Sequence, residues 1–387
     1  MVSIIPVVGI TIYSTLTLTD SYTSDRLEQL NAIGHNKADA LVNWFGERRG
    51  DCDFMTKTPS VRNLAYDAGN YGTGHSHMVM MNAAEEIEEV MQVMINVYGT
   101  YTEMYLLNTS GYIVAQQSAE GWGYGHSKGA DQSTKEYFTA AYAQRTDEEF
   151  TYLSDFRWSS DNEYIQIVTS SVIHDMDGNF VGVVVFYIDS TYVDALMQAT
   201  EGLGSSGETY LVNHEGYWLT VSKFDYYTAE TGLYNDLSEI ILTEQLTSVG
   251  IVAALANKID TKKPATRDYR GIHVMGSYSY LLINSEGLPW ILVAEIDVSE
   301  ALKVVNDLTT ISIWIVVIIG VIVAVIGYVI AKKFTDPIIK LNTLSIRVAE
   351  GDLIHIGDDG KVRKGNDEIA VLGRSFGTMT ENIRDII

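Results

Sequence analysis

Two stretches of the chain decide its fold: MYLLNTSGYIV at residues 104–114 and TYLVNHEGYWL at residues 209–219. Laid over each other, they match at five positions: Tyr105 with Tyr210, Leu106 with Leu211, Asn108 with Asn213, Gly111 with Gly216 and Tyr112 with Tyr217. Each is interpreted as two apolar strands joined by a tight Asn-x-x-Gly turn, because asparagine and glycine supply the unusual backbone angles of such turns. The sequence therefore predicts one module that occurs twice in tandem.

The two modules also end alike. DGNFVGVVVFYIDSTYVDAL at residues 177–196 resembles SEGLPWILVAEIDVSEAL at residues 285–302, with a glycine turn, an apolar strand and an Ile-Asp pair in each. We expect an antiparallel sheet with flanking helices in each module, and hence an α+β fold. Asp189 of the first copy recurs as Asp297 in the second, which favours a shared turn or helix-cap role.

Helical patterns precede the first module. No proline occurs from Ser24 to about Phe54, and apolar residues recur there near helical spacing: Leu27, Leu30, Leu41 and Phe45. This pattern predicts a long N-terminal stalk helix. A shorter helix is predicted over residues 82–98, with one apolar face that belongs to the core: Ile87, Val90, Met91 and Met94.

Residues 311–331 form an uncharged run that is long enough to cross a membrane. At about 1.5 Å per residue the run reaches roughly 31 Å, close to the ~30 Å hydrocarbon core of a bilayer. Lys332 and Lys333 follow it and indicate a cytoplasmic C-terminal side. Residues 1–18 are a weaker candidate, interpreted as a first transmembrane helix with a short or truncated start. Residues 19–310 would then lie outside the cell.

The charge distribution agrees with this division. The net charge is −24, and the segment after residue 331 holds nine basic and nine acidic residues, so the whole excess lies before it. Such an acidic surface argues against a nucleic acid partner, which requires basic patches. Solubility or adaptation to salt is the favoured explanation of the charge. Cys52 is the single cysteine, so the outer region has no intrachain disulfide and must depend on its hydrophobic core.

The C-terminal segment, residues 332–387, carries a heptad seam on two short helices. Its apolar positions are Leu341, Leu344 and Val348, then Ile369, Leu372, Phe376, Met379, Ile383 and Ile386. Neither helix could bury the seam alone, so we expect a parallel homodimeric four-helix bundle. The pattern DPIIKL…AEGDL…NDEIAVLGRSF resembles a HAMP domain, which implies a relay function. Asp367 and Glu368 would lie at the N-terminus of the second helix, where carboxylates are favoured.

The outer region resembles the double-Cache (dCache) sensors of prokaryotic receptors. The resemblance rests on the long helix, the two PAS-like modules and the phrases GSSGETYLVNHEGYWL, DQSTKEYF and WILVAEIDVSEAL. It implies that a membrane-distal module, about residues 60–198, holds the ligand. The proximal module, about residues 200–300, would transmit the signal or be vacant.

The resemblance also suggests a ligand site in the distal module. The amino-acid-sensing branch carries an Arg-x-Trp-Tyr clamp for the ligand carboxylate and an aspartate for the amine. Lys135-Glu136-Tyr137-Phe138 stands at the clamp, and Tyr187 stands at the aspartate position. Lysine lacks the bidentate fork of arginine, so the motif disfavours an α-amino acid and leaves an organic acid or other small polar metabolite. The candidate site residues are Lys135, Tyr137, Phe138, Tyr152, Trp158, Tyr187 and Asp189; alternatively, the aromatic residues are core.

The sequence offers little support for metal binding or catalysis. His75, His77 and His126 lack ligand spacing and a cysteine cluster, so we expect no metal site. DMDGNF at residues 175–180 begins like a calcium loop but has Phe186 at its twelfth position, so it is interpreted as a hairpin turn. The sequon at Asn108 coincides with the repeat's turn and is interpreted as structural. No catalytic motif or cofactor signature appears, and we expect no enzyme activity for these residues.

Together these patterns predict a homodimeric membrane receptor with two transmembrane helices, an extracellular sensor for a small molecule and a cytoplasmic HAMP relay. The output module is expected to follow residue 387. A methyl-accepting chemoreceptor is the first alternative for it, and a sensor histidine kinase or another HAMP-coupled enzyme is the second. An extracellular adhesin or hydrolase anchored by its C-terminus is disfavoured by the heptad seam.

Overall fold

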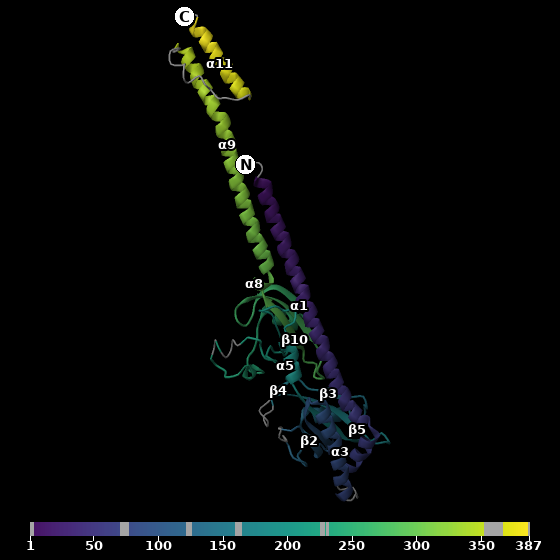
Figure 1. The fold of residues 1–387 in the computed structure, drawn as a ribbon. Coiled ribbons are helices and arrows are strands. Elements are labelled where there is room, and N and C mark those ends of the chain that lie inside the picture. Colours follow the sequence, from purple (N-terminus) through teal and green to yellow (C-terminus); the bar gives the residue numbers. More distant parts are fainter. Residues whose placement is uncertain are drawn as a thin grey trace. The chain divides into compact units, whose positions relative to one another are not determined.

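A computed structural model describes residues 4–69, 77–120, 126–158, 165–224, 229, 232–351 and 367–385. The chain divides into two compact units. Thr19–Lys303 form the first, called the sensor unit here, and Met1–Leu18 with Val304–Ile387 form the second, called the helical unit. Figure 1 shows the course of the chain through these elements.

The N-terminal helix α1 (Ile4–Lys57) confirms the predicted stalk and extends it at both ends. Within the sensor unit it packs against both modules. The Phe45 and Trp290 rings lie 5.5 Å apart in an edge-to-face contact, and the Cys52 thiol lies 3.8 Å from the carbonyl oxygen of Val184. Because Leu41 and Phe45 are fully buried, the stalk is an integral part of the sensor core.

The module that the sequence predicts to be membrane-distal, called the distal module here, begins with the helices α2 (Pro59–Gly69) and α3 (His77–Tyr98). The strands of its sheet follow: β1 (Tyr101–Asn108), β2 (Ile113–Ser118), β3 (Thr151–Leu153), β4 (Arg157–Trp158), β5 (Ile165–His174) and β6 (Phe180–Asp189). The antiparallel order is β2-β1-β6-β5-β3, and β4 pairs with β5. Helices α1, α2 and α3 cover one face, α4 (Glu136–Ala143) covers the other, and α5 (Thr191–Gln198) leads onward.

The proximal module has a smaller antiparallel sheet of order β7-β10-β9-β8. Its strands are β7 (Glu208–Val212), β8 (Thr261–Arg267), β9 (His273–Leu281) and β10 (Trp290–Asp297). The short helix η1 (Leu237–Ile240) and α7 (Val249–Asn257) cover one face. After β10 the chain enters α8 (Val298–Ala301). Two tandem α/β modules are thus confirmed.

The predicted turns of the repeat agree at the level of single hydrogen bonds. Asn108 Oδ1 accepts from the backbone N–H of Ser110 and of Tyr112, and Asn213 Oδ1 accepts likewise two and four residues onward. Gly111 and Gly216 have φ of +87° and +89°, which L side chains rarely adopt. In the proximal copy the second arm is not a full strand, because among the described residues it makes isolated bridges, one between Trp218 and Val212 and one between Tyr217 and Gln245.

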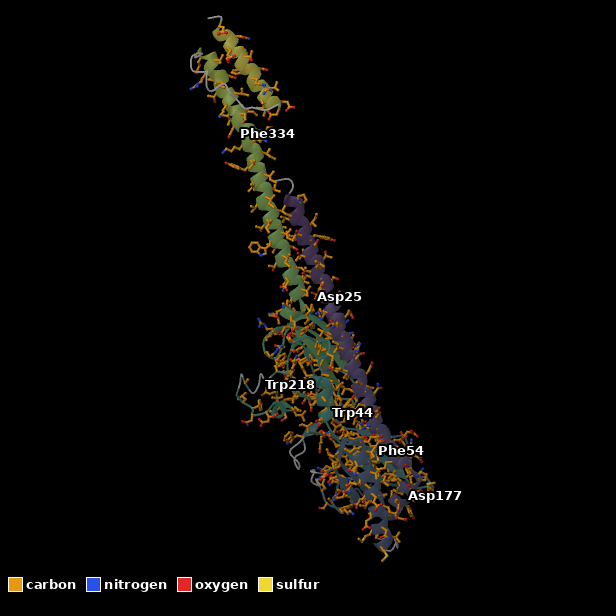
Figure 2. The ribbon with its side chains drawn as sticks, viewed as in Figure 1. Asp25, Trp44, Phe54, Asp177, Trp218 and Phe334 are labelled. Carbon is orange, nitrogen blue, oxygen red and sulfur yellow. The ribbon has the colours of Figure 1, made fainter. Side chains whose placement is uncertain are left out.

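The turn predicted at residues 175–180 belongs to the same type. Asp175 Oδ1 accepts from the backbone N–H of Asp177 and of Asn179, and Gly178 has a φ of +85°. The segment therefore joins β5 to β6 as a hairpin turn, and Figure 2 shows Asp177 there, in the distal module.

Helix α9 (Lys303–Ala349) contains both the predicted span 311–331 and the first HAMP helix, with Pro337 inside it. Among the described residues, α9 is the one helix that is both long enough and apolar enough to cross a membrane. A first span at residues 1–18 stays a prediction. Asp367 is the N-cap residue of helix α11 (Glu368–Arg384), and its Oδ1 accepts from the Ala370 N–H. The seam residues Leu341 and Leu344 are buried against α11. Residues 352–366 and Ile386 lie outside the described residues.

Candidate functional site

Four of the seven predicted site residues meet in one buried cluster, on the face of the distal sheet that α4 covers. Tyr137 and Phe138 come from the first turn of α4, Tyr152 from β3 and Tyr187 from β6. Tyr105 of β1 joins them, and its ring centroid lies 5.3 Å from that of Tyr187. Because side chains alternate along a strand, Tyr105 shares this face whereas Met104 and Leu106 enter the opposite core.

The hydroxyl groups of this cluster form a hydrogen-bonded chain. Tyr187 Oη donates to Tyr137 Oη at 3.1 Å, and Tyr137 Oη donates to Gln132 Oε1 at 2.7 Å. Tyr105 Oη donates to the buried carboxylate of Glu103. Burial raises the pKa of Tyr187 well above its ordinary value, so its phenol stays protonated. We call Glu103, Tyr105, Gln132, Tyr137 and Tyr187 the tyrosine cluster; its groups suit recognition of a polar molecule.

Three predicted residues lie elsewhere. Lys135 is exposed at the N-terminus of α4, and Trp158 is exposed on β4. The ion pair of Arg157 with Glu136 joins β4 to the start of α4. Lys135 and Trp158 are the chain neighbours of these two residues and therefore lie at one rim of the cluster. Asp189 Oδ1 accepts from the backbone N–H and the hydroxyl of Thr191, which is the turn form of the predicted turn or cap role, since Ser190 is the N-cap residue of α5.

The second member of that predicted pair behaves differently. Asp297 has no side-chain cap bond, and its Oδ1 instead accepts from Arg270 at 2.9 Å. The sequence favours a shared turn or helix-cap role; Asp297 does stand at the N-cap position of α8, but its side chain makes no capping bond there. The two aspartates thus occupy matching positions in the repeat but bind different partners, Thr191 for Asp189 and Arg270 for Asp297.

Tyr152 connects the cluster to the proximal module. Its hydroxyl donates to Glu286 Oε1 at 2.6 Å, and the same oxygen accepts from the Asp155 N–H and from Arg157. Burial opposes ionisation of Glu286, but the hydrogen bonds from Tyr152 and Arg157 outweigh burial and hold the pKa of this carboxyl below its ordinary value. Trp290 of β10 donates to Asp155 Oδ1 at 2.6 Å. Tyr152, which packs in the same buried core as the tyrosine cluster, thus contacts the loop before β10 directly.

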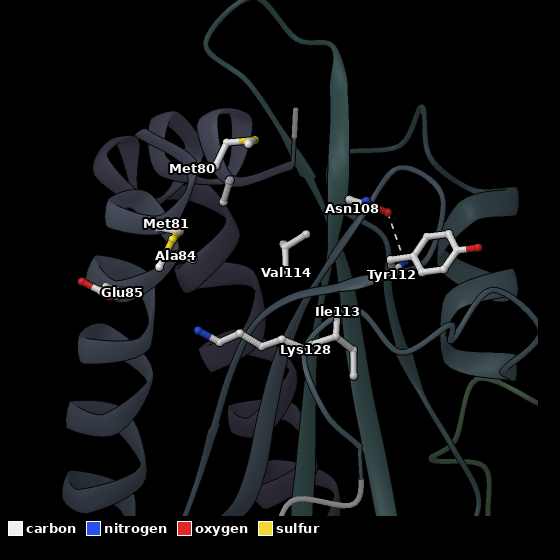
Figure 3. Close-up of a pocket in the computed structure, with 11 residues that line it drawn as sticks. Met80, Met81, Ala84, Glu85, Asn108, Tyr112, Ile113, Val114 and Lys128 are labelled. Carbon is white, nitrogen blue, oxygen red and sulfur yellow. Dashed lines mark hydrogen bonds between the residues drawn. The ribbon is translucent and has the colours of Figure 1, made fainter. Parts of the chain in front are cut away.

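A cavity of about 610 Å³ lies on the other side of the distal sheet (Figure 3). It is lined by Ala68, Met80, Met81, Ala84, Glu85, Asn108, Tyr112, Ile113, Val114, Lys128 and Gly129. Its walls are mostly apolar, and Lys128 at the rim forms an ion pair of 2.7 Å with Glu88. Such a cavity suits an apolar body with a polar end. Sequence reasoning missed it, because it arises where two helices meet a hairpin.

The histidines considered for a metal are not gathered in one metal site among the described residues. His126 packs beside the Tyr105 ring with centroids 6.5 Å apart, and His75 lies outside the described residues. Within the described ranges, no group of three or more histidine, cysteine or acidic residues is arranged to hold a metal ion.

Comparison with known families assigns the chain. Residues 16–305 match the Cache domain family, and residues 329–385 match the HAMP domain family. The chain therefore belongs to the Cache domain family and carries a HAMP domain at its C-terminal side. Both are sensory and signalling domains. The predicted α+β fold with two Cache modules and a HAMP segment is confirmed.

Individual relatives agree with this assignment. The chemotaxis protein McpC of Bacillus subtilis, a methyl-accepting protein, is 26% identical over 129 residues, which are 33% of this chain and 18% of McpC. The chain thus matches less than a fifth of that protein's length. The extracellular domain of vpHK1S-Z8, named as a histidine kinase, superposes with a TM-score of 0.50 at 16% identity, covering 75% of this chain and 98% of that one.

A further solved structure has a similar fold over much of the chain. The ligand-binding domain of Campylobacter jejuni chemoreceptor Tlp3, solved with L-norvaline, gives a TM-score of 0.48 at 12% identity over 73% of this chain and 94% of that one. The prediction that disfavours an amino acid ligand finds no support in these comparisons.

Proposed function

We propose that this chain is the sensing and relaying part of a membrane receptor. A small extracellular molecule binds to the distal module, and the response passes through the proximal module and α9 to the HAMP helices. One observation carries the proposal: β10 leads through α8 into α9, and α9 continues as one helix to Leu341 and Leu344 of the HAMP segment. Membership of the Cache and HAMP families supports it.

The tyrosine cluster is the proposed ligand site. Hydroxyl groups that both donate and accept can recognise carboxylates, amides or amines, and Lys135 at the rim would attract an anionic group. Phe138 and Trp158 would supply apolar walls. Organic acids, amino acids and other small polar metabolites all fit this chemistry. Tyr152 would pass a change at the site to Glu286, since the two are hydrogen-bonded.

A thermal-shift screen of the sensor unit tests the site. Amino acids, organic acids, amines, purines and sugars are added, and a ligand at 100 times its dissociation constant should stabilise the unit by about 2.7 kcal/mol. Tyr187→Phe keeps the ring but loses one hydrogen bond, so the affinity should fall about tenfold. Lys135→Ala should weaken binding of acids specifically. Tyr142→Phe is the matched control, because Tyr142 lies on the partly exposed side of α4.

The cavity beside α3 is the alternative ligand site, and a variant in it shows which of the two sites binds the ligand. Ala84→Phe places a ring in the cavity and leaves the opposite face of the sheet unchanged. If this variant abolishes binding while Tyr187→Phe and Lys135→Ala bind normally, the ligand occupies the cavity and the tyrosine cluster is discarded as the site.

The proposed topology places the sensor unit outside the cell and the HAMP helices in the cytoplasm, with spans at residues 1–18 and 311–331. Ser238 and Ser375 are exposed positions on the two sides. A membrane-impermeant thiol reagent should label Ser238→Cys but not Ser375→Cys in intact cells. Cys52 is fully buried and should not interfere. Labelling of both variants would overturn this topology.

For the output we propose a methyl-accepting chemoreceptor, with a histidine kinase as the second candidate. The match to McpC favours the first, and the superposition on vpHK1S-Z8 agrees in fold with both. The gene sequence beyond residue 387 distinguishes them. A long helical hairpin with heptads indicates a chemoreceptor, whereas a helix with a phosphorylatable histidine followed by an ATP-binding domain indicates a kinase.

A further inference from the structure

Two buried glutamates face each other in the proximal sheet. Glu208 of β7 and Glu295 of β10 are direct cross-strand partners, and each is 1% exposed. Gly276 of β9 pairs with Glu295 on its other side, and Lys263 of β8 pairs with Gly276. Neighbouring strands lie about 4.8 Å apart, so the carboxyl groups of Glu208 and Glu295 are adjacent in one row across the sheet. In the same row, Gly276 leaves no side chain between Glu295 and Lys263. No ion pair between described residues joins Lys263 to either glutamate.

The two carboxyl groups are satisfied very differently. Glu208 accepts from Tyr269 Oη at 2.8 Å, from Ser222 Oγ at 3.2 Å and from the Lys223 N–H at 3.2 Å. Glu295 Oε1 accepts one long bond of 3.3 Å from Tyr210 Oη. Glu295 Oε2 is buried without a hydrogen-bond partner. Three donors favour the ionised form of Glu208, whereas the surroundings of Glu295 favour a neutral acid.

The other charges nearby do not neutralise the pair. The charge of Arg270 acts on both glutamates, but its Nε binds Asp268 at 2.6 Å and its Nη2 binds Asp297 at 2.9 Å. Lys223 Nζ donates to the carbonyl oxygens of Ser205 and Gly207. The rings of Tyr210 and Tyr278 also face Glu295, from β7 and β9. Acidic groups therefore outnumber the cations in this region of the module.

Little room exists for a larger ligand at Gly276. A Cβ atom there would lie 2.6 Å from Tyr278 Oη, so the Tyr278 side chain fills the space over the glycine. A proton is a ligand that requires no cavity and that would remove the charge that Glu295 would otherwise bury. Two adjacent carboxylates with little solvent do not both ionise readily, because each raises the free energy of the other's charge.

We propose that Glu208 and Glu295 form a proton-binding site in the proximal module, with the proton on Glu295. Loss of that proton at higher pH weakens the pairing of β7 with β10. Burial raises the pKa of both groups, and the neighbouring Glu208 raises that of Glu295 further. Glu295 lies two residues before the end of β10, which leads to α8. The site stands on these contacts alone and does not depend on a ligand in the distal module.

Infrared spectroscopy of the full chain in lipid nanodiscs tests the proposal. A protonated carboxylic acid has a carbonyl band that a carboxylate lacks, and ordinary glutamates lose this band near pH 4.3. The wild type should keep such a band at about pH 7, and Glu295→Gln should lose it. Glu215→Gln, an exposed residue of the same module, is the matched control and should keep the band.

A second variant keeps the test decisive if Glu295→Gln fails to fold. Glu208→Gln removes the neighbouring charge but leaves Glu295 in place, so the band should disappear at a pH at least about one unit lower than in the wild type. A band that is absent from the wild type at about pH 7 would overturn the proposal. So would a band at about pH 7 that is as strong in Glu295→Gln as in the wild type, or one whose titration is the same in Glu208→Gln as in the wild type.

Thermal unfolding of the same samples gives an independent measure. A raised pKa in the folded state means that the folded chain holds a proton which the unfolded chain releases at lower pH. The stabilisation is therefore complete below the unfolded pKa of about 4.5 and declines as the pH rises toward the folded value. The unfolding temperature of the wild type should fall from about pH 5 to about pH 8. Glu295→Gln should show a flatter profile, and equal slopes would contradict the proton site.

Discussion

The hydroxyl of Tyr152 donates a hydrogen bond of 2.6 Å to Glu286 Oε1, and this bond joins the two modules of the sensor. Tyr152 belongs to the buried face of the distal sheet, whereas Glu286 precedes β10 of the proximal sheet. The backbone supports the same junction, because the Ser285 N–H donates to the Leu153 carbonyl oxygen at 2.8 Å. The modules are therefore coupled by specific polar contacts as well as by apolar packing.

Glu286→Ala should loosen this junction. The carboxylate accepts from Tyr152, Arg157 and the Asp155 N–H, and hydrogen bonds to a charged group contribute about 1.5–3 kcal/mol. Because Glu286 is partly exposed, we expect the free energy of unfolding to fall by an amount near the lower end of this range, about 1.5 kcal/mol. Urea unfolding of the sensor unit measures it, with the largely exposed Glu149→Ala as control. Equal midpoints for the two variants would contradict the structural role of Glu286.

The same carboxyl predicts an acid dependence. Its pKa is held below the ordinary value by the hydrogen bonds of Tyr152 and Arg157, which outweigh its burial. The stabilisation is thus present above the unfolded pKa of about 4.5 and is lost as the pH falls through the folded value. Wild type and Glu286→Gln should differ most near neutral pH and converge in acid. A difference that grows on acidification would contradict this assignment.

Lys37→Met should destabilise the contact between the stalk and the end of α5. Lys37 Nζ donates to the carbonyl oxygens of Leu196 and Met197 at 2.7 and 3.2 Å and to Thr209 Oγ1 at 2.7 Å. Methionine keeps much of the volume but leaves buried acceptors unpaired, at about 1–3 kcal/mol for each such group. We expect a loss of about 2–4 kcal/mol in urea unfolding. A loss below about 1 kcal/mol would show that water replaces the ammonium.

Burial also gives Lys37 a signature in alkaline solution. It lowers the pKa of Lys37 from 10.5 to about 8, so the folded chain releases a proton that the unfolded chain retains. The free energy of unfolding of the wild type relative to Lys37→Met should therefore rise between about pH 8 and about pH 10.5. A flat difference over this range would indicate an ordinary lysine.

Gly111→Ala should cost more than Gly129→Ala in the same module. Both glycines have positive φ, +87° and +85°, and alanine is strained in this region by about 1 kcal/mol. A Cβ on Gly111 would lie 2.7 Å from the Cα of Ser133, whereas a Cβ on Gly129 would meet nothing within 4 Å. We expect losses of about 2–4 and about 1 kcal/mol respectively. Thermal unfolding of the two variants measures the difference, and equal losses would show that Ser133 moves aside freely.

The HAMP helices should pair with a second copy of the chain. Leu372 and Met379 belong to the predicted seam, yet they are 60% and 44% exposed in a single chain. Leu372→Cys should therefore form a disulfide-linked dimer when the full chain is oxidised in membranes. Glu381→Cys lies on the opposite side of the heptad and should crosslink weakly. Equal crosslinking of the two variants would contradict a dimer through this seam.

The sequence predicted the elements that have a repeating pattern. The turns at Asn108 and Asn213 were predictable because the repeat shows the same residues twice. In α3 the apolar face was predicted nearly correctly, with Ile87, Met91 and Met94 buried, but Val90 is 36% exposed. Helical spacing alone does not determine how wide the buried stripe is, since that depends on the surface against which the helix packs.

The candidate site was predictable only in part. Tyr137 and Tyr187 were predicted from a family motif, and the structure places them in hydrogen-bond contact. Glu103 was missed, although a glutamate in a buried strand at the position matching Glu208 was an available signal. The Tyr152–Glu286 bond joins residues 134 positions apart, and no local pattern encodes such a contact.

The length of α9 constrains any exchange of its output module. The helix runs 47 residues without a break. Each residue added to a helix turns everything after it by about 100° and moves it by about 1.5 Å. Inserting seven residues would preserve the facing side to within about 20°, whereas inserting two would reverse it. Receptor chimeras built on this sensor should therefore be joined by helical phase first, and sequence similarity at the junction should matter less.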